Sequence, residues 1–209
     1  MMINEASSSK PESRQAGDQI ARWLSRIFHP FVISLFTFWL ALYLSETSAL
    51  QALQWVGLGF LVVIAPLAIV ILYSVRSGQF TDLDVSIREQ RHRLYILAFI
   101  CFILLILILN LLNAPRLALG CLYAAVVAIA LGAIINRVLT KVSLHSVASA
   151  GSATVLFVVS PIPGLILGAI ALAVGWARVR LKRHTVEQVL LGWLIAVVCV
   201  GLILPLFID

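Results

Sequence analysis

Residues 94–113 read LYILAFICFILLILILNLLN, twenty positions without an acidic or basic side chain. About 20 apolar residues in a helix are enough to cross the hydrocarbon core of a bilayer. The stretch therefore predicts a membrane-spanning helix. The rest of the 209-residue chain agrees, because 62% of its residues are hydrophobic and only 11% are charged. Soluble domains carry roughly a quarter charged residues, so this composition excludes an ordinary soluble domain.

Five further runs without charged residues lie on either side of this stretch. The longest, 142–177, exceeds one crossing and is interrupted by Ser160-Pro161-Ile162-Pro163-Gly164, which favours a tight reversal. The pattern predicts an all-α integral membrane protein, a bundle of about seven (six to seven) transmembrane helices. The predicted helices cover residues 27–45, 50–75, 94–113, 116–136, 143–160, 164–178 and 187–207.

The amino-terminal segment has a different composition. Residues 1–18 are polar and rich in serine, which predicts a disordered tail, with residues 19–209 forming a single transmembrane domain. In residues 19–28, QIARWLSRIF, apolar side chains recur at helical spacing, while Arg22 and Arg26 share the other side. This segment is either a helix lying in the headgroup region or an extension of the first spanning helix.

The positions of the basic residues predict the orientation. With seven crossings, the amino terminus and residues 76–93, 137–142 and 178–186 lie on one face, which carries fourteen of the fifteen lysines and arginines. Arg116 is the one basic residue on the other face. Cytoplasmic loops are enriched in Lys and Arg, so we expect a multi-pass protein of the cell membrane with its amino terminus and these three connections in the cytoplasm.

The same distribution bears on partners and cofactors. The net charge of +6 follows from cations placed between apolar runs, as membrane topology requires, so we expect no nucleic-acid partner. Cys101, Cys121 and Cys199 fall inside apolar runs at no metal-ligand spacing. We expect no metal and no cofactor, and the sequence does not specify an oligomeric state.

The chemistry-bearing residues gather in three connections of that one face, residues 82–93, 141–145 and 178–188. Three of the four histidines lie there, and His29, beside Pro30, is assigned a structural or interfacial role. Ionisable residues at a membrane boundary are functional candidates. For Asp82 and Asp84, helix capping, metal binding and pairing with arginine are all open, and pairing is preferred.

Spacing groups these residues further. Lys141 and His145 are four apart, and Arg88 and Arg91 three apart, so each pair is expected to share a helical face and to point at one anion. The Gln188 carbonyl, four residues after His184, is placed to accept a hydrogen bond from one imidazole nitrogen and leave the other free. Arg178 needs a turn to reach His184.

Several cations with two histidines suit a phosphate group. Its transition-state charge is spread over oxygens that Arg and Lys donors bind. One histidine can act as nucleophile, and a second can protonate the leaving oxygen, which gives a two-step hydrolysis through a phosphohistidine.

These residues resemble the type 2 phosphatidic acid phosphatase and vanadium haloperoxidase superfamily over about residues 82–192. Its third motif, S-R-x5-H-x3-D, is similar to the segment that starts at Ala177-Arg178 and includes His184 and Gln188, with Gly192 following. Its second motif, P-S-G-H, is matched in part by Val142-Ser143-Leu144-His145. For the first, K-x6-R-P, Arg91 supplies the arginine, whereas Asp84 and His92 replace the lysine and proline.

The resemblance implies a role for each matched residue. His184 is implied as the nucleophile, His145 as the general acid, and Arg178 and Ser143 as phosphate ligands. Gln188 stands where the family has an aspartate that orients the nucleophile. Lys141, Arg88 and Arg91 are further candidate phosphate ligands.

The sequence thus predicts a metal-independent membrane lipid phosphatase that acts on a lipid phosphate or diphosphate. Phosphatidic acid is the first candidate substrate and a prenyl diphosphate the second, each entering from the surrounding membrane lipid. The alternative is a non-catalytic protein of the same fold that binds anionic lipid or scaffolds partners, motivated by Gln188 and Leu144. A metal-dependent lipid transferase using Asp82 and Asp84, or a transporter, ranks lower, because acidic residues are few and the ionisable groups avoid the midplane.

Overall fold

The computed structural model describes residues 12–45 and 47–208, and this part of the chain contains helices and no strands. The helical elements are α1 (Glu12–Ile27), α2 (Pro30–Leu44), α3 (Ala49–Gly59), the π-helical turn η1 (Phe60–Ile64), α4 (Ala65–Arg76), α5 (Arg91–Leu111), α6 (Arg116–Val138), α7 (Leu144–Val159), α8 (Pro161–Arg180), α9 (Val186–Ile203) and the 3-10 turn η2 (Leu204–Phe207). The all-α fold class is confirmed.

Five of the helical rods are long and apolar enough to cross a membrane. They are Ala49–Arg76, which joins α3, η1 and α4, together with α5, α6, α8 and Val186–Phe207. A sixth span is formed by α1 and α2 if this pair, bent by 51°, counts as one. The remaining predicted crossing, residues 143–160, corresponds to the apolar helix α7, which is only 16 residues long, about 24 Å. The structure is that of a multi-pass membrane protein.

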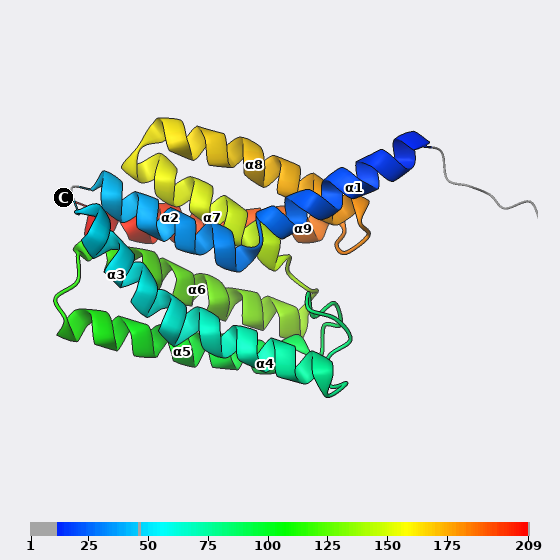
Figure 1. Ribbon diagram of the computed structural model, residues 1–209, viewed down its shortest axis with the longest axis horizontal. Coiled ribbons are helices and arrows are strands. Elements are labelled where there is room, and N and C mark those ends of the chain that lie inside the picture. The colour runs from blue at the N-terminus through cyan, green and yellow to red at the C-terminus, as the bar shows by residue number, and fades with distance from the viewer. Residues whose placement is uncertain (1–11, 46, 209) are drawn as a thin grey trace, which may run out of the picture.

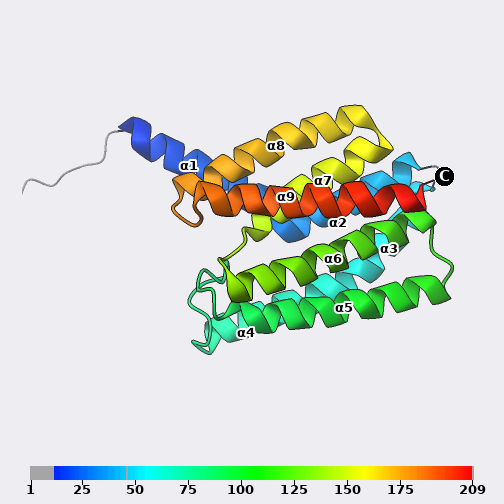
Figure 2. The same cartoon turned by 180° about the vertical axis from the view of Figure 1, so that it is seen from behind.

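The helices run back and forth between two ends of the bundle (Figure 1). The connections α4–α5, α6–α7 and α8–α9 meet at the end from which α1 emerges, and we call this end the polar end. The connections α2–α3, α5–α6 and α7–α8 lie at the opposite end with the carboxyl terminus, as the view from behind also shows (Figure 2). The grouping of the three connections predicted from the sequence is therefore confirmed.

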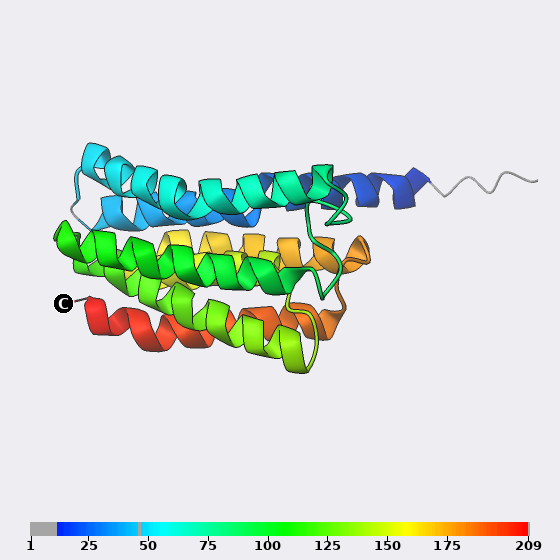
Figure 3. The ribbon, with the colours of Figure 1, turned by 90° about the horizontal axis from the view of Figure 1, so that it is seen from below.

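Helix α7 occupies the middle of one half of the bundle. It packs against α2, α8 and α9, while α5 packs against α6 and α6 in turn against α9. Figure 3 shows α2 and the α3–α4 rod on one side of the bundle, and α6 and α9 on the other. Small side chains, among them buried Ser146, Ser149 and Ala150, make this central position possible, because small residues let membrane helices approach closely.

A single residue separates α7 from α8. Ser160 has an extended backbone, with φ −154° and ψ 110°, and Pro161 is the first residue of the next helix. Proline is tolerated at this position, because the N–H that it lacks would have no partner within the helix. Gly164 then lies directly against the backbone of Phe157, where a Cβ atom would collide. The predicted reversal is present, but it is shorter than expected, because the helix resumes at Pro161 and not at residue 164.

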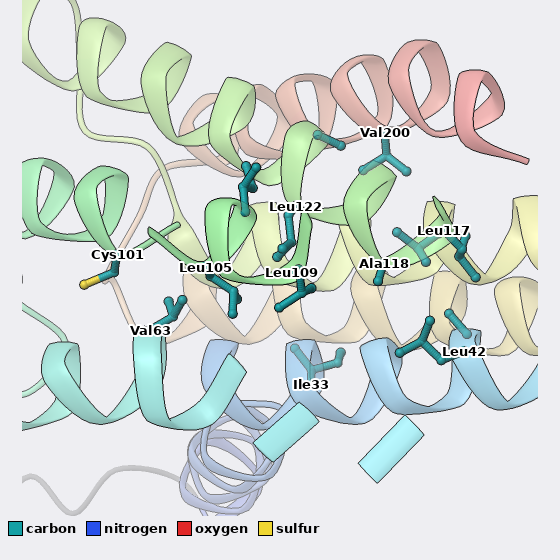
Figure 4. Packing of buried hydrophobic residues seen from close by; sticks show 14 of the residues in the cluster. Ile33, Leu42, Val63, Cys101, Leu105, Leu109, Leu117, Ala118, Leu122 and Val200 are labelled. Carbon is teal, nitrogen blue, oxygen red and sulfur yellow. The ribbon is translucent and has the colours of Figure 1, made fainter. Parts of the chain in front are cut away.

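The larger hydrophobic core takes residues from α2, the α3–α4 rod and every helix from α5 to α9 (Figure 4). Leu42, Leu105 and Leu109 are among its most buried members. Because lipid tails are as apolar as leucine, these side chains stabilise the bundle through close van der Waals packing and not through removal from water. The three cysteines are unpaired; Cys101 and Cys199 are buried, whereas Cys121 is partly exposed.

The predicted amino-terminal tail needs a correction. Helix α1 begins at Glu12, so residues 12–18 are helical and not a tail, whereas residues 1–11 lie outside the described residues. A break at His29 and Pro30 separates α1 from α2 by a 51° bend. The physical reason is the proline, which starts a new helix because it cannot continue the previous one.

Candidate functional site

The three polar connections meet in space. Arg178 at the end of α8 donates from Nη2 to the Asp84 carboxylate across 2.8 Å. Arg91 donates from Nη1 to the Val142 carbonyl across 2.7 Å. Gln188 donates from Nε2 to Thr140 Oγ1 across 3.0 Å. These bonds tie residues 82–93, 141–145 and 178–188 into one cluster.

The end of α8 brings Arg178 next to His184. The Arg183 N–H and the His184 N–H both donate to the Arg178 carbonyl, at 3.0 and 3.3 Å, and the Lys182 N–H donates to Val179. Lys182 has φ +55°. This is the pattern of a Schellman motif, which ends a helix with one residue in the left-handed region. The turn expected between Arg178 and His184 is thus confirmed.

His184 is held by the amino-terminal turn of α9. Its Nδ1 lies 3.0 Å from Gln188 Oε1, and that oxygen also accepts the Thr185 N–H at 3.3 Å. Thr185 and Gln188 form a capping box, in which side chain and backbone satisfy each other. Because Gln188 Nε2 donates to Thr140, the amide is fixed with its oxygen toward His184. The predicted His184–Gln188 contact is confirmed.

Burial sets the charge state of His184. The side chain is 6% exposed, and burial, followed by the positive charge of Arg91, lowers its pKa to about 3, although the Gln188 hydrogen bond acts in the opposite direction. The ring is therefore neutral at pH 7. With Nδ1 bonded to the amide, Nε2 is the nitrogen available to a reacting group.

His145 lies in the first turn of α7, and the residues around it fix its ring. Its Nε2 lies 3.3 Å from the Ser25 carbonyl of α1, and its ring makes an edge contact with His29 at 5.5 Å between centroids. Gly192 of α9 lies against the carbonyl of Ser143, where an added Cβ atom would be 3.0 Å from the oxygen. This close approach brings α9, which begins after His184, against the start of α7.

Arg178 is a charged side chain that is almost completely buried. It is 2% exposed, its Nη2 is bonded to Asp84, and its Nε is buried with no hydrogen-bond partner. Burial raises the pKa of Asp84, but the charge of Arg178 and its hydrogen bond outweigh this effect and leave the pKa below its usual value. The predicted pairing of the acidic residues with arginine is confirmed, since Arg183 Nη1 also lies 3.8 Å from Asp82 Oδ2.

The other candidate phosphate ligands are placed differently from the expectation. Arg91 donates to the carbonyls of Val85 and Val142, both at 2.7 Å, and Arg88 Nε donates to the Asn136 carbonyl. The two arginines therefore bind separate backbone segments and do not point at one anion. They hold the α4–α5 connection against its neighbours, because backbone carbonyls satisfy their buried donors.

Lys141 and Ser143 lie in the link before α7. Because the helix begins at Leu144, the spacing of Lys141 and His145 does not place them on one helical face, and this expectation was wrong. Burial, then the charge of Arg91, lowers the pKa of Lys141. Ser143 is fully buried and caps α7, accepting the Ser146 N–H at 3.3 Å. Neither residue lines the cavity described next.

A cavity of about 350 Å3 opens beside the cluster. Its charged and imidazole-bearing lining comes from the polar end, namely His29, Asp84, Arg91, His145, Arg178 and His184. Beyond this end the wall is largely aliphatic and aromatic, reaching Leu105 on α5 and Val200 on α9. Arg91 and Leu105 are separated along α5 by about 21 Å. The arrangement suits a ligand with an anionic head and a long apolar tail.

Sequence reasoning missed several residues of the site. Thr140 and the Ser25 carbonyl orient Gln188 and His145 from distant segments, and no local pattern marks them. His29 caps α2, its Nδ1 accepting the Phe31 N–H at 3.3 Å, so its structural role is as expected, but it also lines the cavity. The capping box of Thr185 and Gln188 was a signal available in the sequence.

No protein-family model, curated protein or solved structure matches the chain. Among the described residues, no three histidine, cysteine, aspartate or glutamate side chains are close enough to hold a metal ion.

Proposed function

We propose that the protein is a membrane lipid phosphatase that hydrolyses a lipid phosphate or diphosphate through a phosphohistidine. The observation that carries the proposal is Arg178, a buried arginine with an unpartnered Nε in the wall of an apolar cavity. A buried donor without a partner is costly, and an anionic ligand oxygen would satisfy it. His184 and His145 line the same cavity.

Each residue of the candidate site has a role in the proposed hydrolysis. Nε2 of neutral His184 attacks the phosphorus, the bond from phosphorus to the lipid oxygen breaks, and that leaving oxygen takes up a proton from solvent by way of His145. Water then attacks the phosphohistidine, His145 takes a proton from it, and His184 leaves as a neutral ring. Arg178 binds the phosphoryl oxygens while their charge builds up, and Gln188 keeps the ring of His184 in place.

The shape of the cavity favours a lipid as the substrate. The described chain has helices and short connections, and the apolar part of the cavity lies among the helices that form the membrane bundle. A lipid would place its phosphate at the polar end and its hydrocarbon between α2, α5, α6 and α7. Phosphatidic acid remains our first candidate and a prenyl diphosphate the second.

We further propose that the polar end faces the cytoplasm of the cell. The cations of this end, including exposed Arg22, Arg26 and Arg93, favour the cytoplasmic side by the rule that positive loops stay inside.

Phosphate release tests the proposal. The full-length protein in mixed micelles would be given phosphatidic acid and farnesyl diphosphate in parallel, in the presence of EDTA. We expect release that His184→Ala abolishes and that His92→Ala, a change at an exposed histidine of the same end, leaves intact. Release equal in wild type and His184→Ala would overturn the mechanism.

A second candidate is a non-catalytic protein that binds anionic lipid. The Arg178–Asp84 pair favours it, because a carboxylate already neutralises the arginine meant for phosphate. Gln188, a neutral amide beside the nucleophile, favours it too. Saturable binding of phosphatidic acid without phosphate release in the same micelles would select this function over hydrolysis.

A further inference from the structure

Helix α1 presents two different long surfaces. One surface packs against α8: Asp18 Oδ1 lies 3.0 Å from Arg180 Nε, while Ala21 and Ser25 are 0% and 7% exposed. Gly17 continues this surface, because a Cβ atom there would collide with the Arg180 guanidinium. The spacing of these residues, close to four, follows one side of the helix. Helix α1 is therefore anchored to the bundle on this side.

The remaining surface of α1 is apolar and cationic. Ile20, Trp23 and Ile27 form a stripe at helical spacing, with exposed fractions of 55%, 57% and 54%. Arg22 and Arg26, four apart, are exposed alongside this stripe. A helix with bulky apolar residues on one side and arginines beside them is typical of segments that lie in the membrane interface.

The position of α1 in the fold agrees with the interface. The 51° bend at His29 turns α1 away from the direction of α2, and the helix projects from the polar end of the bundle (Figure 1). Trp176 on the neighbouring α8 is 45% exposed, and the Arg180 guanidinium lies over its ring at 5.5 Å. Exposed tryptophans at helix ends mark the headgroup level of a bilayer.

We propose that the stripe of Ile20, Trp23 and Ile27, with Arg22 and Arg26, binds the anionic headgroup surface of the leaflet at the polar end. The apolar stripe enters the boundary between headgroups and acyl chains, and the two arginines pair with lipid phosphates. Asp18, the acidic residue on the packed side, is already bonded to Arg180 and does not oppose this attraction.

Docking of α1 has a consequence for the candidate site. The Ser25 carbonyl, on the packed side of α1, holds Nε2 of His145 at 3.3 Å. A lipid surface that fixes α1 therefore also fixes the ring of His145 in the cavity wall. The binding surface itself does not depend on the proposed hydrolysis.

Amide hydrogen exchange over residues 15–27 tests the proposal. The full chain would be placed in nanodiscs of neutral phosphatidylcholine, with or without phosphatidylglycerol. We expect slower exchange of α1 with the anionic lipid, and loss of this difference in the double variant Arg22→Gln/Arg26→Gln. At the usual strength of basic residues near an anionic surface, two arginines shift the docking equilibrium about thirtyfold.

A matched variant separates the surface of α1 from general charge. Arg93→Gln removes an exposed cation at the same end of the bundle but on α5, and it should retain the full lipid effect. Unchanged exchange in α5 and α9 verifies that each variant is folded. Equal exchange of α1 in both bilayers, or a double variant that keeps the wild-type difference, would overturn the proposal.

Discussion

Arg178 donates to Asp84 across 2.8 Å although the two residues are 94 positions apart in the chain. The bond occupies one terminal nitrogen of the guanidinium and leaves Nε without a partner. The arginine is buried, while the Asp84 side chain is 25% exposed. An anion that enters the cavity therefore meets an arginine whose charge is already balanced, and it has to share or displace the carboxylate.

The first prediction concerns this carboxylate. Asp84→Asn keeps the side-chain shape and removes the negative charge, so we expect a phosphate lipid to bind roughly tenfold or more tightly, since repulsion at this range in a partly buried site amounts to a few kcal/mol. Titration calorimetry with a short-chain phosphatidic acid in detergent measures the change. Asp82→Asn is the control, because Asp82 lies beside exposed Arg183, where a pair contributes little. Weaker binding by Asp84→Asn would contradict this role for the carboxylate.

The second prediction concerns the orientation of His184. Gln188→Ala removes the acceptor of Nδ1 and half of the capping box, so phosphate release should fall roughly a hundredfold and stability by about 1 kcal/mol. Thr140→Val removes only the bond that orients the amide, and it should lower the turnover number with a smaller loss of stability. Steady-state kinetics and thermal unfolding in detergent separate the two effects. An unchanged turnover number in both variants would show that the amide does not position the ring.

The third prediction is a pH dependence of stability. His184 has a pKa of about 3 in the folded protein and an ordinary value of 6.5, so below pH 6.5 the unfolded state binds a proton that the folded state does not. Stability should therefore fall as the pH is lowered from about 6.5 toward 3, with a limiting slope near 1.4 kcal/mol per unit for this group. Unfolding midpoints in detergent, compared between wild type and His184→Gln, isolate its share. If stability varied with pH in the same way in both proteins, this role of His184 would be refuted.

Local patterns in the sequence were sufficient to predict much of the fold. The uncharged runs located the helices, and the alternation of crossings placed the three polar connections at one end. His184 and Gln188 could be paired because they are four apart and the helix starts between them. Such features depend on near neighbours in the chain, where helical periodicity determines distance.

The remaining contacts of the site depend on packing. His145 meets the carbonyl of Ser25, 120 positions away, and Arg91 meets the carbonyls of Val85 and Val142. Every residue carries a backbone carbonyl, so the residue types in the sequence do not indicate which carbonyl accepts a hydrogen bond. For this reason the sequence predicted Arg88 and Arg91 as anion ligands. In the structure, both arginines donate to backbone carbonyls and hold neighbouring connections together.

The fourth prediction concerns the turn between α7 and α8. Gly164→Ala would place a Cβ atom against the backbone of Phe157, which cannot move without separating the two helices, so we expect a loss of about 1–3 kcal/mol. Gly168→Ala, one turn later on the same helix, meets nothing within 4 Å and should be neutral or slightly stabilising. Thermal unfolding of both variants gives the comparison. Equal effects of the two substitutions on stability would mean that the close approach of Gly164 to Phe157 does not contribute to the stability of the fold.

The fifth prediction concerns the apolar part of the cavity. Ala148 on α7 lines it one turn beyond His145, so Ala148→Phe should block the path of a lipid tail and raise the KM for long-chain phosphatidic acid about tenfold, since forcing extra bulk into a packed apolar site costs about 1–3 kcal/mol. A small soluble phosphate ester, which needs only the polar end, should react as before. Val198→Phe adds similar bulk at a position 43% exposed and should change neither reaction. If Ala148→Phe slows both substrates equally, the cavity does not hold the tail, and the lipid would have to approach the histidines from the bilayer surface.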